Sequence, residues 1–392
     1  MQPCRKLFLS NTPASAVAKL NRRDPIHNRR FISKTFNVIK DCNPDSYVAA
    51  ARKINDSKID VVNIQHEFGL YKGDFGSYIL EFLEKLRKPV VVTFHTVLPD
   101  PPSGMKKVVR EIYGLSDRIT VSAQAGINIL RDTFGLSKSK LTIIPHGVPD
   151  VPFVKTEWAK RYLGLSGKFV IASYGLINPD KGIEYVLEAL PSVIEHNPGK
   201  QIVYMVVGEL HPGLDQRLRE AYRDKLETLV RELDLSRNVL LVERYLSNRE
   251  MIMHFLATDV CAVTNMNANQ ISSGVLSQAI GCGKSIVATK FAHAAEALSN
   301  GRGLFVDFGD ATDIAHKLNE LVRDEVLRAQ ISRDAYLYGR SMTWDKIARK
   351  YVDIFTHIRE PQTRSPASML VRTSLPRSLD KMKHSDKRPE SS

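Results

Sequence analysis

Short apolar runs rich in β-branched residues recur along the chain from Asp60 onward, and stretches with helical spacing of apolar positions separate them. Alternating runs and amphipathic stretches are typical of parallel sheets with crossover helices. The pattern therefore predicts an α/β fold with two doubly wound, Rossmann-like sheets. The predicted strands are 61–64, 89–93, 118–121, 141–144, 169–173, 202–207, 239–242, 260–263 and 285–289.

A segment of turn residues separates the two series of strands. Pro145 to Asp150 contains two prolines and a glycine, which interrupt regular structure. We therefore place a first domain at 1–150 and a second at 151–344. Amphipathic stretches at 181–196 and 214–233 predict helices in the second domain, and 345–358 predicts a last helix. The composition of 359–392 turns to Arg, Ser, Pro and Lys, which predicts a disordered tail.

The segment Asn269 to Lys284 joins a polar loop, a predicted helix and a small-residue turn. Ser272-Ser-Gly274 opens the helix, where free backbone N–H groups and the positive end of the helix dipole bind anions such as phosphate. Gln270 lies in the loop and Gln278 about one turn into the helix, eight positions later. Both side chains are predicted to face one ligand.

This segment resembles the signature of the retaining nucleotide-sugar glycosyltransferases of the family-four type, Glu-x7-Glu followed by a small-residue turn and a Val-Val-x-Thr strand. Gln270 and Gln278 stand where the family has its glutamates, which contact the donor sugar and the ribose. Hydrogen bonds to ionised partners are about twice as strong as neutral ones, so the two amides weaken the expected donor site. The resemblance, which extends over residues 46–358, implies a GT-B fold and donor contacts from Gln270, Ser272, Ser273, Gly274, Val275, Leu276 and Gln278.

Two more turns of the second domain resemble donor-binding motifs of the family. Gly175-Leu-Ile-Asn-Pro-Asp-Lys-Gly182 is similar to Gly-Arg-Leu-x-x-x-Lys-Gly, in which the arginine and the lysine contact the diphosphate. Lys181 matches, whereas Leu176 replaces the arginine and removes one cation. The next strand ends in a turn whose glycine lets the backbone approach a nucleotide. The resemblance thus adds donor contacts from Gly175, Lys181, Gly208 and Tyr245, the last of these in the region that borders the base.

The first domain offers polar residues at the carboxyl ends of two predicted strands, where open α/β sheets bind ligands. Thr93-Phe-His-Thr-Val-Leu-Pro99 ends one strand, and the family places a histidine there near the donor sugar or the acceptor hydroxyl. The candidate acceptor contacts are His66, Glu67, Gly73 and His95. The candidate catalytic residues implied by the resemblance are His95, Lys181 and Gln270.

The first 45 residues do not match the strand and Gly-rich turn with which relatives of this family open. Lys6 to Ser10 has the composition of a strand, but the residues after it lack the glycines. Either the first βα unit is absent or it has diverged beyond recognition. Its absence would leave an exposed sheet edge and an incomplete cleft.

The net charge of +13 is concentrated at the two ends, with +7 in residues 1–60, +4 in 358–392 and only +2 between them. We interpret the ends as solvated segments capable of weak contact with an anionic membrane surface. The chain shows neither a Gly-aromatic RNA-binding pattern nor a Cys/His finger, so no specific nucleic-acid binding is expected. A nucleic-acid protein acting through these ends would show steep salt dependence.

The sequence contains no apolar run of membrane-spanning length, no convincing secretion signal and no paired cysteine spacing among its four cysteines. A cytoplasmic location is expected. The resemblance implies retaining transfer of a hexosyl group from a nucleotide-diphosphate sugar to a saccharide hydroxyl, without metal ion or other cofactor. The subgroup of the family with Gln-Ile-x-Ser-Gly at 270–274 and Thr-x-His-Thr-Val-Leu-Pro at 93–99 leans toward hexose transfer onto saccharides. GDP-mannose is one candidate donor, and the sequence does not separate GDP from UDP or ADP.

Two other protein classes are compatible with parts of this pattern. A catalytically impaired sugar-nucleotide-binding or scaffold protein of the same fold would explain Gln270, Gln278 and Leu176 together. A dehydrogenase with two Rossmann-like domains would need Gly-x-Gly-x-x-Gly after a strand, which the chain lacks. The glycosyltransferase remains the preferred interpretation.

Overall fold

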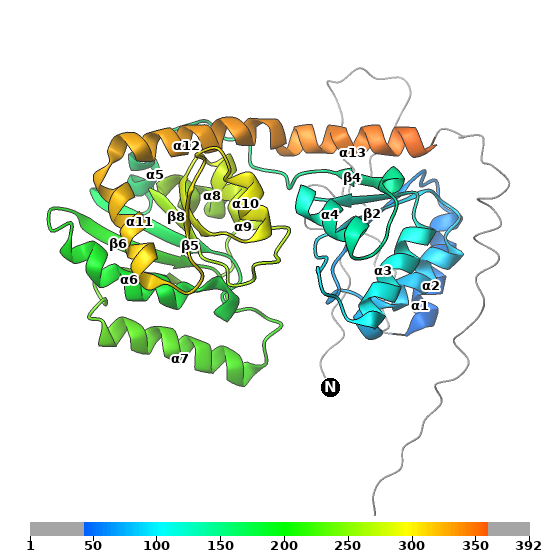
Figure 1. Ribbon diagram of the computed structural model, residues 1–392, viewed down its shortest axis with the longest axis horizontal. Coiled ribbons are helices and arrows are strands. Elements are labelled where there is room, and N and C mark those ends of the chain that lie inside the picture. The colour runs from blue at the N-terminus through cyan, green and yellow to red at the C-terminus, as the bar shows by residue number, and fades with distance from the viewer. Residues whose placement is uncertain (1–42, 360–392) are drawn as a thin grey trace, which may run out of the picture.

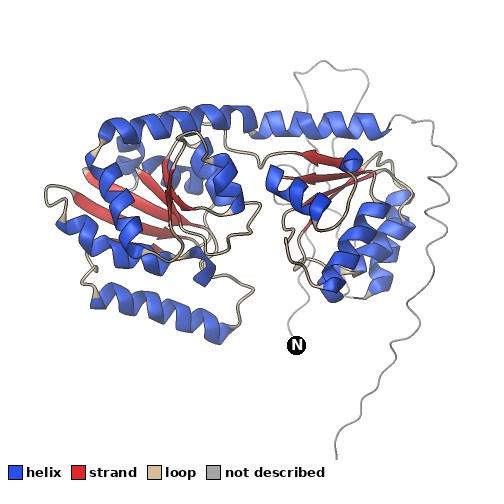
Figure 2. Ribbon diagram, viewed as in Figure 1, coloured by secondary structure: helices blue, strands red, loops and turns tan. Residues whose placement is uncertain are grey.

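The structure, a computed structural model, describes residues 43–359 as two α/β bodies bridged along one side by two consecutive helices (Figure 1). In both bodies the strands form an internal sheet with helices around it (Figure 2). Several expectations from the sequence fall outside the described residues. They are the candidate strand at 6–10, the presence or absence of the first βα unit, most of the two basic ends and the predicted tail beyond Arg359.

The first sheet is parallel and has the order β1-β2-β3-β4. Every residue of β2 is buried, because helices cover both faces of the sheet. All four strands predicted for this half are confirmed. They are β1 (Val62–His66), β2 (Val90–Phe94), β3 (Arg118–Val121) and β4 (Leu141–Ile143), with helices α1 (Pro44–Asn55), α2 (Tyr78–Lys85), α3 (Ser103–Leu115) and α4 (Gln124–Asp132).

The second sheet is also parallel, with the order β10-β9-β8-β5-β6-β7. The chain winds in one direction from β5 and in the other from β8, so these adjacent strands form the topological switch point at which open α/β sheets bind ligands. The five predicted strands are confirmed, and β10 is an addition. The strands are β5 (Lys168–Tyr174), β6 (Gln201–Val207), β7 (Val239–Val242), β8 (Val260–Val263), β9 (Ser285–Thr289) and β10 (Leu304–Val306).

Several helices of the second body start at a side chain that caps them. Ser247 and Glu250 form a reciprocal capping box at α8, and Ser273 caps α9. The predicted helices at 181–196, 214–233 and 345–358 correspond to α6, α7 and α13 to within two residues. The helices are α5 (Thr156–Tyr162), α6 (Ile183–Glu195), α7 (Gln216–Glu232), α8 (Asn248–Ala257), α9 (Gly274–Gly281), α10 (Ala292–Ala297), α11 (Ala311–Arg323), α12 (Glu325–Gly339) and α13 (Trp344–Arg359).

The chain passes between the two bodies twice, and the two passages pair with each other. Val148 and Thr343 form a parallel bridge, with the N–H of Val148 donating to Met342 O at 2.9 Å. The Trp344 ring packs against Gly147 and fills the space that a Cβ there would need. Beyond this junction α13 reaches the first sheet, where the Tyr351 hydroxyl lies 3.0 Å from Thr93 Oγ1.

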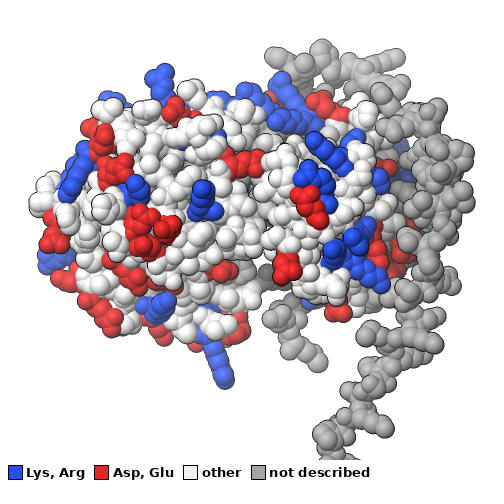
Figure 3. Space-filling model, in the orientation of Figure 1, with Lys and Arg blue, Asp and Glu red and all other residues white. Residues whose placement is uncertain are grey.

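The surface of the described part mixes acidic and basic side chains on the face shown in Figure 3. This agrees with the near-neutral central sequence and gives no large basic surface there. No helix between residues 43 and 359 has the length and hydrophobicity needed to cross a bilayer.

Candidate functional site

The loop before α9 is held by its own polar side chains. The Gln270 amide accepts a hydrogen bond from Asn265 Nδ2 at 2.7 Å and donates through Nε2 to Ser272 O at 2.8 Å. A carboxylate at this position could accept from Asn265 but could not donate to the carbonyl. Glutamine is therefore the residue that fits this loop, and its side chain has a local structural role whether or not it contacts a donor. Gln278 follows in α9 and is half-buried.

We expect Gln270→Glu to destabilise the protein, because the new carboxylate would face the Ser272 carbonyl with no proton to donate. Leaving a partly buried acceptor without its donor costs about 1–3 kcal/mol. Thermal unfolding at pH 7.5 measures the effect. Gln216→Glu makes the same chemical change at an exposed amide of α7, and it should leave the midpoint nearly unchanged. Equal midpoints for Gln270→Glu and the unmodified chain would contradict this role of the amide.

The start of α9 lies beside the turns that follow β5 and β6. The Ser273 hydroxyl accepts from Leu276 N at 3.3 Å, and a Cβ built on Gly175 would lie 3.1 Å from Val275 Cγ2. Gly208, with φ of 146°, has its α-carbon so close to the Gly175 carbonyl that no side chain fits. The structure therefore brings Gly175, Gly208 and the α9 helix start together at the carboxyl edge of the sheet, as the sequence predicted for a donor site.

Lys181 completes this group. A Cβ built on Gly175 would lie 3.7 Å from Lys181 Nζ, so the ammonium lies over backbone without a side chain. Burial lowers the Lys181 pKa from its usual range, and the Asp180 carboxylate partly opposes this. No ion pair of Lys181 occurs among residues 43–359. A half-buried cation beside a helix start and free of a carboxylate partner is suited to binding an anion.

The first domain contributes His95 and Glu67. Nε2 of His95 lies 2.8 Å from Gln65 Oε1, and Glu67 Oε2 accepts from the Thr96 hydroxyl at 2.7 Å. These contacts join the ends of β1 and β2, so the two candidate residues belong to one polar group at the carboxyl edge of the sheet. The pKa of His95 is lowered to about 4, first by burial and then by the charge of His146. The ring is therefore neutral at pH 7.

The other residues predicted from sequence lie less favourably for ligand contact. His66 is fully buried, with its ring stacked on Tyr71 at a centroid distance of 5.4 Å and both ring nitrogens without a hydrogen-bond partner. It cannot reach an acceptor unless this covering moves. Gly73 is exposed and has Ser77 and Tyr78 as nearest neighbours. Tyr245 is 74% exposed at the end of the β7 turn.

Two family profiles match the chain on either side of the passage between the bodies. Glycosyltransferase Family 4 matches residues 11–150, and Glycosyl transferases group 1 matches residues 154–338. The chain belongs to the group 1 glycosyltransferases. The predicted family is thereby confirmed.

Relatives of this group 1 glycosyltransferase include two proteins named D-inositol 3-phosphate glycosyltransferase. The chain is 27% identical over 279 residues to that of Corynebacterium urealyticum, covering 68% of this chain and 62% of the relative. It is 26% identical over 258 residues to that of Corynebacterium jeikeium, covering 63% and 59%. The chain thus spans about three fifths of the length of these relatives.

Solved structures confirm the GT-B fold predicted for this glycosyltransferase. A glycosyltransferase from Rickettsia africae superposes with a TM-score of 0.65 at 16% identity, covering 82% of this chain and 83% of that one. Anabaena HepE in complex with UDP has the same TM-score at 18% identity, covering 80% and 82%. At these identities the likeness establishes the fold alone.

The sequence did not predict one residue of the candidate site. His293 lies at the start of α10, and its ring Nδ1 accepts a hydrogen bond from the Ser273 backbone N–H at 2.9 Å. The backbone N–H of His293 donates to Gln270 O at 3.0 Å. It therefore holds both ends of the loop. Burial and the charge of His146 lower its pKa to about 4. Nothing in Phe291-Ala-His-Ala signals this role, because the partners lie about 20 positions earlier in the chain.

The three histidines whose pKa is lowered to about 4, His66, His95 and His293, predict acid destabilisation. Their unfolded pKa is near 6.5, so the unfolded chain takes up protons first as the pH falls. The free energy of unfolding keeps its full value above about pH 6.5. It declines as the pH falls from 6.5 to 4, by about 1.4 kcal/mol per pH unit for each proton that the unfolded chain takes up. Thermal midpoints across this range measure it.

The thermal midpoint of the His293→Gln variant should depend less steeply on pH than that of the unmodified chain, because one of the three titrating histidines is removed. His316→Gln, at an exposed position on α11, is the matched control and should keep the original slope. Identical slopes for both variants would show that His293 does not contribute.

A hollow of about 390 Å³ continues from the Gly208 turn toward α7 and the end of β7. Arg223 in its wall is bound to Glu243, with Nη2 and Oε2 2.6 Å apart, whereas Nε of Arg219 is buried without a hydrogen-bond partner. The hollow adjoins the candidate donor site. It is lined by Glu209, Leu210, Pro212, Gln216, Arg219, Glu220, Arg223 and Glu243.

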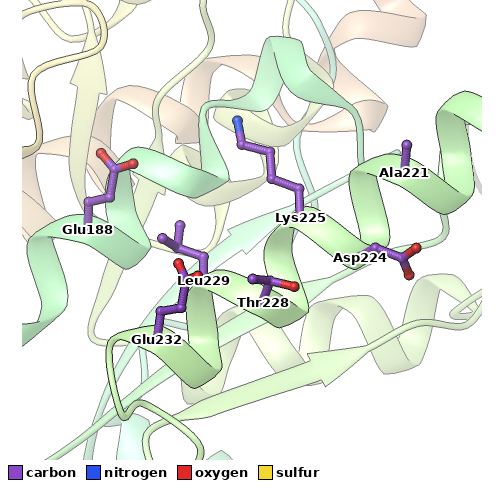
Figure 4. Close-up of a pocket in the computed structure, with 7 residues that line it drawn as sticks. All are labelled: Glu188, Ala221, Asp224, Lys225, Thr228, Leu229 and Glu232. Carbon is purple, nitrogen blue, oxygen red and sulfur yellow. The ribbon is translucent and has the colours of Figure 1, made fainter.

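A second hollow of about 390 Å³ lies between α6 and α7 (Figure 4). Three of its lining side chains are acidic, and Lys225 is paired with Glu184 at 2.9 Å. A groove between two helices is not where open α/β sheets bind ligands, so we do not assign the site there. No group of three or more His, Cys, Asp or Glu within residues 43–359 is arranged to hold a metal ion.

Proposed function

We propose that this chain is a retaining glycosyltransferase that moves a hexosyl group from a nucleotide-diphosphate sugar to a hydroxyl of a saccharide acceptor. The observation that carries the proposal is the position of Lys181, whose ammonium lies over Gly175 beside the start of α9. The Lys181 cation, the backbone of Gly175 and the N-terminus of α9 together form a site suited to a diphosphate. The family membership and the named activity of the relatives support the same reaction class.

The proposed chemistry needs no nucleophile from the protein. The bond from the sugar C1 to the diphosphate oxygen breaks as the acceptor oxygen bonds to C1 on the same face, and the acceptor proton passes to the departing diphosphate. Lys181 and the backbone amides at the start of α9 would stabilise the negative charge that develops on the diphosphate. His95 is neutral at pH 7, which suits a hydrogen bond to the sugar or acceptor hydroxyl.

A second candidate function is sugar-nucleotide binding without turnover. Leu176, which stands where the family motif has its arginine, is 43% exposed next to Gly175. The site would then hold the diphosphate with the Lys181 cation and without the arginine of the motif. Weaker charge stabilisation slows transfer more than it weakens binding when the charge develops in the transition state.

Thermal-shift titration with UDP-, GDP- and ADP-sugars tests the proposed donor site. A ligand at a hundred times its Kd should add about 2.7 kcal/mol of stability. The UDP complex of the HepE structure makes UDP-sugars the first to try, with GDP-mannose beside them. A shift followed by transfer to saccharide acceptors, with the product anomer read by NMR, would support the enzyme. A shift without transfer would favour the binding protein, and no shift with any donor would contradict both.

A further inference from the structure

The loop that precedes α9 belongs to the second domain, but residues of the first domain hold it as well. Ile271 follows Gln270 directly, yet its side chain is 1% exposed and belongs to the hydrophobic core of the first domain. The Ser122 hydroxyl, at the end of β3, donates to Ile271 O at 2.8 Å. We call this packing and hydrogen bond together the Ile271 contact. A residue of the candidate donor loop is therefore anchored in the other domain.

Gly126 in α4 allows this close approach. A Cβ built there would lie 3.1 Å from Ile271 Cδ1 and 3.0 Å from Val121 Cβ. Both distances are shorter than ordinary van der Waals contact between carbon atoms. Since Gly126 lies inside a helix, where alanine is otherwise preferred, the absence of a side chain is explained by the space that Val121 and Ile271 occupy.

A second connection runs through α10. The first N–H of α4, on Gln124, donates to Glu296 Oε2 at 2.7 Å, and a carboxylate at a helix start is stabilised by the helix dipole. Glu296 lies in α10, whose His293 binds both Gln270 O and Ser273 N. The helices α4 and α10, which contact each other from opposite domains (Figure 1), therefore hold the loop from two sides.

We propose that the Ile271 contact controls the donor site, so that the loop 268–276 has its binding conformation only while the first domain holds Ile271. Ser122, Gly126 and Ile271 are then positioning residues that need not touch the nucleotide. Binding of a nucleotide to the ordered loop would favour the arrangement in which the Ile271 contact is formed, by the same factor as that contact favours binding. The link to the donor rests on the proposed function, whereas the control of loop order does not.

Hydrogen exchange of the full chain without ligand tests the control of the loop. In Gly126→Ala the new methyl group should displace Ile271, and in Ser122→Ala the Ile271 carbonyl loses its donor. Backbone amides in 268–276 should exchange at least tenfold faster in both variants. Exchange rates equal to those of the unmodified chain in both variants would overturn the proposal.

Matched controls are available for each substitution. Gly114→Ala places a methyl group on α3, where nothing lies within 4 Å, and Ser341→Ala removes one exposed hydrogen bond to Tyr338 O. Both controls should leave exchange in the loop unchanged. Equally fast loop exchange in a control and in its matched variant would mean that general loosening, rather than the Ile271 contact, frees the loop, and would also overturn the proposal.

Titration with UDP, GDP and ADP tests the link to the donor. The nucleotide that the unmodified chain binds should bind Gly126→Ala and Ser122→Ala about tenfold more weakly, and the two controls as tightly as before. Unchanged affinity despite a freed loop would overturn the coupling between the domains and the donor site. If the unmodified chain binds none of the three, the proposed function fails, and hydrogen exchange still decides whether the Ile271 contact orders the loop.

Discussion

Replacing Lys181 with alanine is expected to lower kcat/KM for sugar transfer by about two to three orders of magnitude, the loss typical of removing one preorganised electrostatic contact to a developing anion. The ammonium lies over Gly175 at the head of α9 and has no ion-pair partner within residues 43–359. Its removal should change the thermal midpoint little, because among the described residues the ammonium has only the long-range attraction of Asp180 and no ion pair to lose. Steady-state kinetics with the donor found by titration measures the loss.

Two further variants make the result specific to this cation. Lys181→Arg keeps the charge and should recover part of the activity. Lys317→Ala removes a surface cation paired with Glu320 at 3.3 Å, and exposed pairs of this kind contribute about 0.2–1 kcal/mol, so its kinetics should be unaffected. Full turnover in Lys181→Ala would remove Lys181 from the mechanism.

Replacing Gly208 with alanine is expected to cause the largest loss of stability among single methyl additions at the site. The residue has φ of 146°, and its α-carbon lies against the Gly175 carbonyl, so the methyl group would be both strained and overlapping. The backbone strain alone costs about 1–3 kcal/mol, and the overlap must add to it by pushing apart the turns after β5 and β6. Thermal unfolding and nucleotide titration measure the two consequences.

Gly199 gives the matched control for this substitution. It has no atom within 4 Å of a built Cβ and is not among the glycines with positive φ. Gly199→Ala should keep both the midpoint and the nucleotide affinity. A Gly208→Ala protein with an unchanged midpoint would show that the two turns separate easily, and the close approach would then have no structural importance.

Most strands could be predicted from the sequence because each buried parallel strand is a short apolar run between breakers. The exception was β10, whose short apolar run Leu304-Phe-Val306 ends at Asp307, whereas the run of the equally short β4 continues through Ile144. The sequence could also predict that Gly175, Gly208 and Lys181 lie close to one another, since the carboxyl ends of adjacent parallel strands meet at one edge of the sheet.

The sequence could not show which polar side chains serve the ligand and which serve the loop. Gln270 was predicted to face a donor, and the structure shows its amide bonded to Asn265 and Ser272. His66 was predicted to contact an acceptor, but Tyr71 of the following loop covers it. His293 became visible only once α10 was packed beside the loop. Such roles depend on contacts between segments whose relative position no local pattern fixes.

The position of α13 has a consequence for synthesis on the ribosome. This helix places the Tyr351 hydroxyl on Thr93 and an Arg359 guanidinium nitrogen 3.6 Å from Asp60, so the first domain acquires contacts from one of the last described segments to emerge. Translation at about 5–20 residues per second separates β4 from α13 by roughly 10–40 seconds. During that interval the part of the first domain that Tyr351 contacts, around Thr93, lacks its cover from α13.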